Sequence, residues 1–248
     1  MAEGKFDAKD LSDAVEMAVN KLILSQTPPK PDLSVEEVQN NVTNLKLLLE
    51  RVPTQTTRTG EQDRFQQFST PPPLAYVAGW VSNLRLGDVV LEPSAGVGGL
   101  AVFAKVAGAR VIGNELSPRR AGLLAQTGIA DQVHTQNAEH LQALLLPEIV
   151  AKRTPEITAV IMNPPFSNAA QTSRRNTLVG AKHVEEALKL LPYKGRLVAI
   201  VGRGMASDAA MFKGWWEKIR KSFDVRANIQ VNGEEHWLPH FLEFGEFK

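Results

Sequence analysis

The sequence predicts an α/β fold built on a doubly wound, mostly parallel β-sheet. From residue 88 onward, short apolar runs alternate with stretches of helical periodicity, a pattern typical of parallel strands covered by helices on both faces. The first apolar run leads into a glycine-rich turn at residues 96–99, as expected where a strand of an open α/β sheet meets a ligand. Together these features predict a Rossmann-like domain.

Six apolar runs are the expected strands, and several residues mark the helices between them. Ser117 with Pro118 is typical of a helix start, because serine favours the N-cap and proline the first turn. An apolar pattern at residues 184–191, and Ser207 ahead of residues 209–219, predict two later helices. The strands are expected at residues 88–91, 110–114, 133–136, 157–162, 196–201 and 225–231.

The first 60 residues differ in pattern from the rest of the chain. Helical periodicity at residues 11–24 and 35–52 is interrupted by a proline-rich breaker at residues 27–31. Ser34 and Glu37 have the spacing of a capping box at the start of the second helix. We therefore expect an N-terminal helical extension at residues 1–60 packed on a catalytic domain at residues 61–248, the alternative being an arm that contacts DNA or a partner.

Composition excludes several kinds of chemistry. The absence of cysteine excludes disulfides, thiolate metal sites and the covalent cysteine attack that methylation of a cytosine ring carbon requires. The five histidines are scattered, and Pro239 separates the one close pair, so we expect no metal site. A net charge of +1 leaves nucleic-acid contact to local basic groups such as Arg174 and Arg175.

Membrane association is not expected. No apolar run approaches the roughly 20 residues needed to cross a bilayer, and the first residues lack the apolar core of a signal peptide. These features predict a cytoplasmic protein, and they leave its oligomeric state open.

Two acidic residues flank the expected cofactor turn. Glu92 ends the first strand just before Gly96 and Gly98, where the backbone can turn tightly and approach a ligand. Glu115 ends the second strand, where a carboxylate can accept hydrogen bonds from two ribose hydroxyls. Glu92 would repel a pyrophosphate but attract the cationic sulfonium and amino groups of S-adenosylmethionine. Charge therefore favours S-adenosylmethionine over a dinucleotide.

The third expected strand leads to Asn137 and Ala138, a position from which such a fold can contact the adenine of its cofactor. The Asn137 side-chain oxygen can accept a hydrogen bond from the adenine amino group. A solvent-exposed loop asparagine explains this residue nearly as well.

The tetrapeptide Asn163-Pro164-Pro165-Phe166 follows the fourth expected strand, at the edge of the sheet where ligands bind. An amino group on an aromatic ring is a poor nucleophile, and two acceptors that hold its N–H bonds help the nitrogen to become tetrahedral. The Asn163 Oδ1 and the Pro164 carbonyl are two such acceptors, which also stabilise the charge that develops on nitrogen. The prolines fix the backbone, and Phe166 offers a face for the target base.

With this tetrapeptide, the sequence resembles the class I amino-methyltransferases, and most closely the N6-adenine DNA methyltransferases, over about residues 67–232. In that family the tetrapeptide binds the flipped adenine, and a threonine-proline segment before the first strand lies against the methionine of the cofactor. Thr70 and Pro71 match that segment. The resemblance implies S-adenosylmethionine as cofactor, bound by Thr70, Pro71, Glu92, Pro93, Ala95, Gly96, Gly98, Glu115, Leu116, Asn137 and Ala138.

The sequence departs from the family pattern in two places. The family commonly has an aspartate where this chain has Asn137, followed by an aromatic residue where it has Ala138. The fold also expects a seventh strand, antiparallel beside the sixth, and residues 240–245 are a poor match, so we expect that this strand is missing.

The resemblance also implies the partners. The substrate would be DNA, single-stranded or opened, because flipping a base costs a few kcal/mol in a duplex. The target DNA sequence would be recognised by residues 1–60, by the loop with Arg174 and Arg175, or by a specificity or motor domain in the same or another polypeptide. The alternatives are methylation of RNA or of a protein glutamine, and a non-catalytic module that binds S-adenosylmethionine or DNA.

Overall fold

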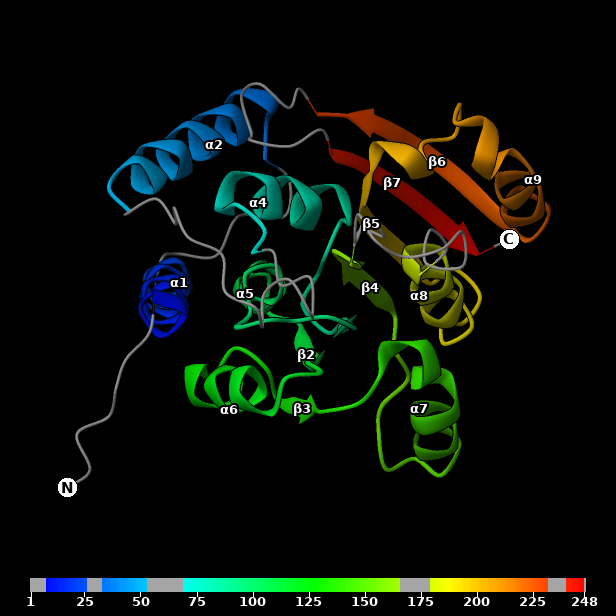
Figure 1. Cartoon of the computed structure of the whole chain (residues 1–248), viewed down its shortest axis with the longest axis horizontal. Coiled ribbons are helices and arrows are strands. Elements are labelled where there is room, and N and C mark those ends of the chain that lie inside the picture. The colour runs from blue at the N-terminus through cyan, green and yellow to red at the C-terminus, as the bar shows by residue number, and fades with distance from the viewer. Residues whose placement is uncertain (1–7, 26–32, 53–68, 166–178, 232–239, 248) are drawn as a thin grey trace.

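The computed structural model describes residues 8–25, 33–52, 69–165, 179–231 and 240–247 (Figure 1). The described strands form one seven-stranded sheet in the order β3-β2-β1-β4-β5-β7-β6. The first five strands in this order are parallel, and β7 is antiparallel to both β5 and β6. The strands are β1 (Val89–Glu92), β2 (Arg110–Asn114), β3 (Gln132–His134), β4 (Ala159–Met162), β5 (Arg196–Gly202), β6 (Phe223–Gln230) and β7 (His240–Phe247).

Helices cover both faces of the sheet. One layer holds α4, α5 and α6, and the other holds α7, α8 and α9 (Figure 1). Outside the first layer, α1 contacts α5 and α6, and α2 contacts α4. The helices are α1 (Ala8–Leu24), α2 (Val35–Glu50), α4 (Pro72–Val81), α5 (Ala101–Val106), α6 (Pro118–Thr127), α7 (Leu141–Val150), α8 (Val179–Leu188) and α9 (Lys213–Ser222).

The central strands feed two hydrophobic clusters, one on each face of the sheet. Val90 of β1 packs into the cluster beneath α4 and α5, whereas its neighbour Leu91 packs into the cluster beneath α7 and α8. Ile161 and Val160 of β4 divide between the two clusters in the same way. These four side chains are fully buried, as expected for parallel strands covered on both faces. The core therefore holds the carboxyl ends of β1 and β4 in fixed positions.

This architecture confirms the predicted fold class, and β2 has the predicted bounds. The expectation that the seventh strand is missing is wrong. Residues 240–247 form β7, which pairs with β5 along one side and with β6 along the other. Its glutamates and Gly245 have low strand propensity, but backbone hydrogen bonds to a strand on each side stabilise the extended conformation of the segment. A β-bulge between Val225 and Ala227 of β6 adjusts the register.

One further difference from the sequence prediction and one confirmed prediction lie near the start of the fold. We did not predict α4, whose two leading prolines start a helix because their missing N–H groups have no helical partner in the first turn. In α2 the capping box is present, with Ser34 Oγ accepting from the Glu37 amide and Glu37 accepting from the Ser34 amide. The boundary expected at residue 60 lies outside the described residues.

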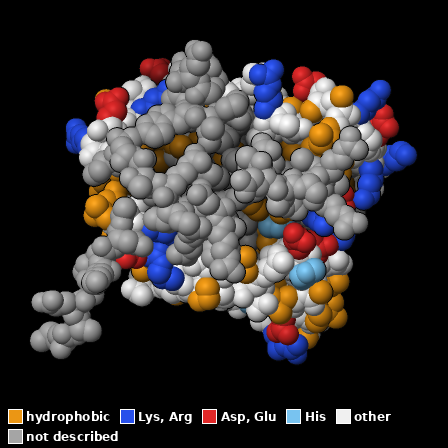
Figure 2. Space-filling view, viewed as in Figure 1, with side chains coloured by type: hydrophobic (Ala, Val, Ile, Leu, Met, Phe, Trp, Pro, Cys, Tyr) orange, Lys and Arg blue, Asp and Glu red, His pale blue; other side chains and the backbone are white. Residues whose placement is uncertain are grey.

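Basic side chains gather on one part of the described surface. Lys and Arg side chains gather over α9, at the right edge of Figure 2, where Lys213, Arg220 and Lys221 are exposed. Trp216 of the same helix faces the core: it is buried, and its Nε1 donates to the Met205 carbonyl at 2.8 Å. No described helix combines the length and apolar character that crossing a membrane requires.

We predict that Ser34→Ala lowers the free energy of unfolding by about 1 kcal/mol, because the first turn of α2 loses an acceptor for the Glu37 amide. Urea denaturation of the whole chain measures this change. Thr43→Ala is the matched control, since it removes an exposed hydroxyl from the middle of the same helix and should cost nothing. Equal stability of the Ser34→Ala variant and the wild type would contradict the role of the cap.

Candidate active site

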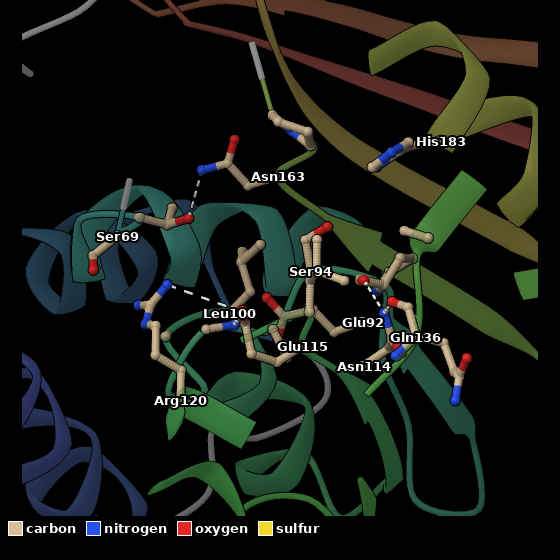
Figure 3. Close-up of a pocket in the computed structure, with 18 of the residues that line it drawn as sticks. Ser69, Glu92, Ser94, Leu100, Asn114, Glu115, Arg120, Gln136, Asn163 and His183 are labelled. Carbon is tan, nitrogen blue, oxygen red and sulfur yellow. Dashed lines mark hydrogen bonds and ion pairs between the residues drawn. The ribbon is translucent and has the colours of Figure 1, made fainter. Parts of the chain in front are cut away.

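A pocket opens at the carboxyl ends of the parallel strands (Figure 3). Its empty volume is about 740 Å³, part of it open to solvent. The turn after β1, the residues after β2 and β3, and the end of β4 form most of the wall. Further lining residues come from α1, α6, α8 and the segment before α4: Glu16, Ser69, Thr70, Arg120 and His183.

The turn after β1 approaches its neighbours closely. Gly96 and Gly98 have φ values of 57° and 99°, which favour glycine. A Cβ on Gly98 would lie 3.1 Å from both Leu124 and Ile129, so the turn packs directly on α6 and the residues that follow it. Ala95, Gly96 and Gly99 of this turn line the pocket.

Glu92 lies under the turn with only 2% of its surface exposed. Its Oε2 accepts a hydrogen bond from the Ala101 amide at 2.8 Å, at the first turn of α5, where a carboxylate is favoured by the helix dipole. Burial nevertheless raises the pKa of Glu92 well above its ordinary value, and the nearby Glu16 and Glu115 carboxylates add to the rise. A cationic ligand in the pocket would favour the ionised form.

Glu115 connects the second strand to the turn. One carboxylate oxygen accepts from the Gly96 amide at 2.8 Å, and the other accepts from the Ser117 amide at 2.8 Å. An ionised carboxylate offers about four acceptor positions, so two remain for a ligand such as a pair of ribose hydroxyls. Glu115 is therefore preorganised by the backbone it faces.

Asn114, which the sequence prediction missed, joins three loops. Its Nδ2 donates to the Pro93 and Gln136 carbonyls, each at 2.9 Å, and its Oδ1 accepts from the Gln136 amide at 3.0 Å. With 1% of its surface exposed, it crosslinks the ends of β1, β2 and β3. An asparagine at the end of a buried apolar strand was the available signal in the sequence.

The far end of the pocket contains Asn137, Ala138 and His183. Asn137 Oδ1 accepts from the Glu139 amide at 3.0 Å and caps a short 3₁₀ helix, which leaves one lone pair of that oxygen for a ligand. His183 of α8 faces this end of the pocket (Figure 3). Its buried Nδ1 has no hydrogen-bond partner among the described residues, and burial lowers its pKa. Sequence reasoning missed His183.

Asn163 is held at the mouth of the pocket by a residue far away in sequence. Its Nδ2 donates to Thr70 Oγ1 at 2.9 Å (Figure 3). Its Oδ1 is buried and has no hydrogen-bond partner among the described residues. An unpaired buried acceptor costs free energy, so this oxygen is a candidate contact for a ligand N–H group.

The structure brings most of the predicted site residues to this pocket. The lining includes Thr70, Glu92, Pro93, Ala95, Gly96, Glu115, Leu116, Asn137, Ala138, Asn163 and Pro165. Pro71, Gly98 and Pro164 are adjacent in sequence to lining residues but do not line the pocket themselves. Phe166, Arg174 and Arg175 lie outside the described residues. The lining residues that sequence reasoning missed include Glu16, Ser69, Asn114, Arg120, Gln136 and His183.

Comparison with known proteins identifies the fold. No model of a known protein family and no curated protein matches the sequence. TrmN from Thermus thermophilus matches in structure with a TM-score of 0.54 at 19% identity, over 98% of this chain and 80% of TrmN. A putative RNA methyltransferase from Pyrococcus horikoshii matches with a TM-score of 0.55 at 16% identity, over 83% of this chain and 98% of that one.

A third structural neighbour is a putative DNA modification methyltransferase encoded within an E. coli prophage. It matches with a TM-score of 0.51 at 17% identity, over 65% of this chain. This chain spans 47% of its length, and 45% of the length of another neighbour, PH0851. The sheet order and these likenesses show that the protein has the class I, Rossmann-like methyltransferase fold.

We predict that Glu92→Gln stabilises the ligand-free protein increasingly as the pH rises above 4.5, the ordinary pKa of the group. With a raised pKa in the folded state, native Glu92 binds more protons than the unfolded chain, so the wild type loses stability as its carboxyl ionises. Glutamine keeps an acceptor for the Ala101 amide and does not ionise.

Thermal unfolding across a pH series measures this difference. Glu156→Gln, which removes an exposed carboxylate, is the control and should leave the pH dependence unchanged. A stability difference between the Glu92→Gln variant and the wild type that stays constant with pH would contradict the prediction.

Proposed function

We propose that this protein is an S-adenosylmethionine-dependent methyltransferase that modifies the N6 amino group of adenine in DNA. The observation that carries the proposal is the buried Oδ1 of Asn163, which has no hydrogen-bond partner in the described parts of the chain. The Nδ2 of the same amide already donates to Thr70 Oγ1, so in this arrangement the oxygen is the atom of the amide that remains to accept from a ligand. An acceptor at this position suits an amino group.

The pocket fits the chemistry of S-adenosylmethionine. The described ionisable groups that line it, apart from His183, are the carboxylates Glu16, Glu92 and Glu115 and the guanidinium of Arg120. This excess of carboxylates suits a sulfonium and an ammonium better than a pyrophosphate. Glu115 would hold the ribose, and Asn137 with His183 would surround the adenine. When bound, the cofactor would supply an electrophilic methyl group.

The residues of the chain would act mainly by positioning. Asn163 Oδ1 and the Pro164 carbonyl would accept the two N–H bonds of the target amino group and stabilise the positive charge that develops on it. Thr70 would keep the Asn163 amide from rotating. No general base is needed, because the charged product nitrogen is acidic and loses its proton to water. Phe166 would stack on the base.

Adenine in DNA is supported by the upstream segment. Thr70 belongs to the threonine-proline segment by which the sequence resembles N6-adenine DNA methyltransferases, and it contacts the predicted catalytic Asn163 directly. RNA is the second candidate substrate, because one structural neighbour is described as a putative RNA methyltransferase. The cytoplasm would be the place of action, and a specificity or motor domain would be a further partner.

We predict that Asn163→Ala lowers the rate of methyl transfer by about 10²–10³-fold, as expected when one preorganised contact to the transition-state charge is lost. Binding of S-adenosylmethionine, measured by calorimetry, should remain close to that of the wild type. Thr70→Val is the companion variant, because it removes the hydroxyl that orients Asn163 and should lower the rate to a smaller extent. Full activity of the Asn163→Ala variant would exclude the mechanism.

The substrate can be identified with labelled S-adenosylmethionine. We predict that label enters N6-methyladenine in DNA, and that a single-stranded oligonucleotide reacts faster than the matched duplex because no base pair has to open. Nucleoside analysis after digestion identifies the product, and RNA of the same sequence is the comparison. A clear preference for the duplex would contradict the expected need for opened DNA, and labelling of RNA alone would replace DNA with RNA as the substrate.

A further inference from the structure

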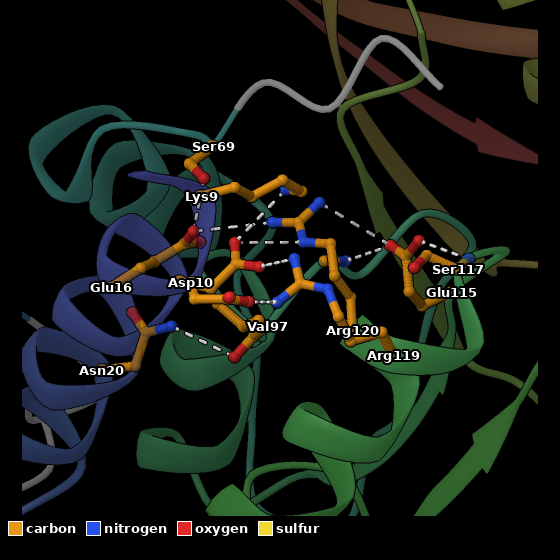
Figure 4. Close-up of polar contacts among 12 residues, drawn as sticks. Lys9, Asp10, Glu16, Asn20, Ser69, Val97, Glu115, Ser117, Arg119 and Arg120 are labelled. Carbon is orange, nitrogen blue, oxygen red and sulfur yellow. Dashed lines mark hydrogen bonds and ion pairs between the residues drawn. The ribbon is translucent and has the colours of Figure 1, made fainter. Parts of the chain in front are cut away.

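Helix α1 contributes a carboxylate to the pocket. Glu16 lines the end of the pocket opposite Asn137, next to Ser69 and Arg120 (Figure 4). Ser69 Oγ donates to Glu16 Oε2, and Arg120 Nη2 lies 3.5 Å from the same oxygen. Glu16 Oε1 lies 3.2 Å from the point where a Cβ on Gly99 would be. The carboxylate therefore reaches over the turn that follows β1.

Glu16 has acceptor capacity left. Its Oε1 accepts no hydrogen bond from the part of the chain that the structure describes, and its side chain is 16% exposed, so a ligand can reach it from the pocket. Burial raises the pKa of Glu16, and Asp13 adds to this, while Arg120 and Ser69 oppose it. The pocket thus holds a carboxylate that a cation would stabilise.

The position of Glu16 is fixed by contacts between α1 and the body of the protein. Asn20 Nδ2 donates to the Val97 carbonyl in the turn at 3.2 Å. Arg119 of α6 pairs with Asp13 and, at 2.8 Å, with Asp10 (Figure 4). These contacts lie on both sides of Glu16 along the helix, so the carboxylate is held in place before any ligand binds.

Arg120 supplies the opposite charge beside Glu16. Its guanidinium is 5% exposed and lies between Glu16 and Glu115, at 3.5 Å and 4.0 Å. A carboxylate and a guanidinium side by side are complementary to an α-amino acid, which carries an ammonium and a carboxylate on one carbon. Asn163 lies above the middle of the pocket, between the end with Arg120 and Ser69 and the end with Gln136 (Figure 3). If the amino-acid end of the cofactor bound here, its methyl-bearing sulfur would lie beneath Asn163.

We propose that Glu16 of the N-terminal helix binds the α-ammonium group of the cofactor, with Arg120 facing the α-carboxylate. The inference rests on the proposed function, since it assigns the amino-acid end of the same cofactor site. It makes α1 a part of the cofactor site. The end with Asn137 and His183 is left for the adenine.

The test combines one substitution with one change in the ligand, each measured by calorimetry. The ligands are S-adenosylhomocysteine and S-adenosyl-4-thiobutyrate, which lacks only the α-amino group. Wild-type protein should bind S-adenosylhomocysteine about 10-fold or more tightly than the deaminated ligand, the value of a hydrogen bond to a charged group. Glu16→Gln should remove most of this difference, while binding of the deaminated ligand stays nearly unchanged.

Asp10→Asn is the matched control. It weakens one ion pair between α1 and Arg119, but the Asp13–Arg119 pair and the hydrogen bond from Asn20 to Val97 remain. Asp10 does not line the pocket, so the variant should keep the wild-type preference for the amino group. An equal loss for both ligands in Glu16→Gln, or the same loss in Asp10→Asn, would overturn the inference in favour of a purely structural role.

The outcomes also separate this inference from the proposed function. If the wild type binds S-adenosylmethionine and transfers methyl groups but shows no preference for the amino group, only the role of Glu16 fails. If the wild type binds none of these ligands, the proposed function fails together with it. Because this comparison uses the wild-type protein alone, it does not depend on whether any variant folds.

Discussion

Two adjacent side chains at the end of β2 hold the candidate site together. Asn114 crosslinks the ends of β1, β2 and β3, and Glu115 accepts from backbone amides on either side of it. Each loop alone would be mobile, because a loop gives up conformational entropy when it is ordered. The buried hydrogen bonds of these two residues offset that cost at the point where the three loops meet.

Carboxylates dominate the electrostatic character of the pocket. Glu92, Glu115 and Glu16 converge on a small volume from three different elements, and Arg120 alone, among the described lining residues, compensates them with a permanent charge. Burying several like charges opposes folding, and the raised pKa values of Glu16 and Glu92 reflect this. Such strain is common where a site is shaped for a ligand of the opposite charge. The ligand-free protein is therefore less stable than its core alone would make it.

The sequence was informative where local patterns determine structure. The buried β1, the glycine turn after it and the capping box at Ser34 follow from local composition and spacing, and all three are present. The missed features depend on contacts between distant residues. Glu16 precedes the turn it covers by about 80 residues, and nothing in the periodicity of α1 distinguishes it from a surface glutamate. The pairing of Thr70 with Asn163 spans 93 residues. His183 lies in an ordinary amphipathic helix, and only the fold turns it toward the pocket.

The order of strands has a consequence for how the chain folds. The parallel part of the sheet, from β3 to β5, forms from segments that follow one another and are joined by helices. Strand β7 then has to pair with β5, either before β6 or together with it, because β6 joins the described sheet through β7. Until it does, the buried apolar strand β5 has an open edge, which is a template for pairing with other chains. Non-local pairing of this kind is slow. Aggregation during folding should therefore begin at the edge of β5, and the speed with which β7 docks should limit the yield of folded protein.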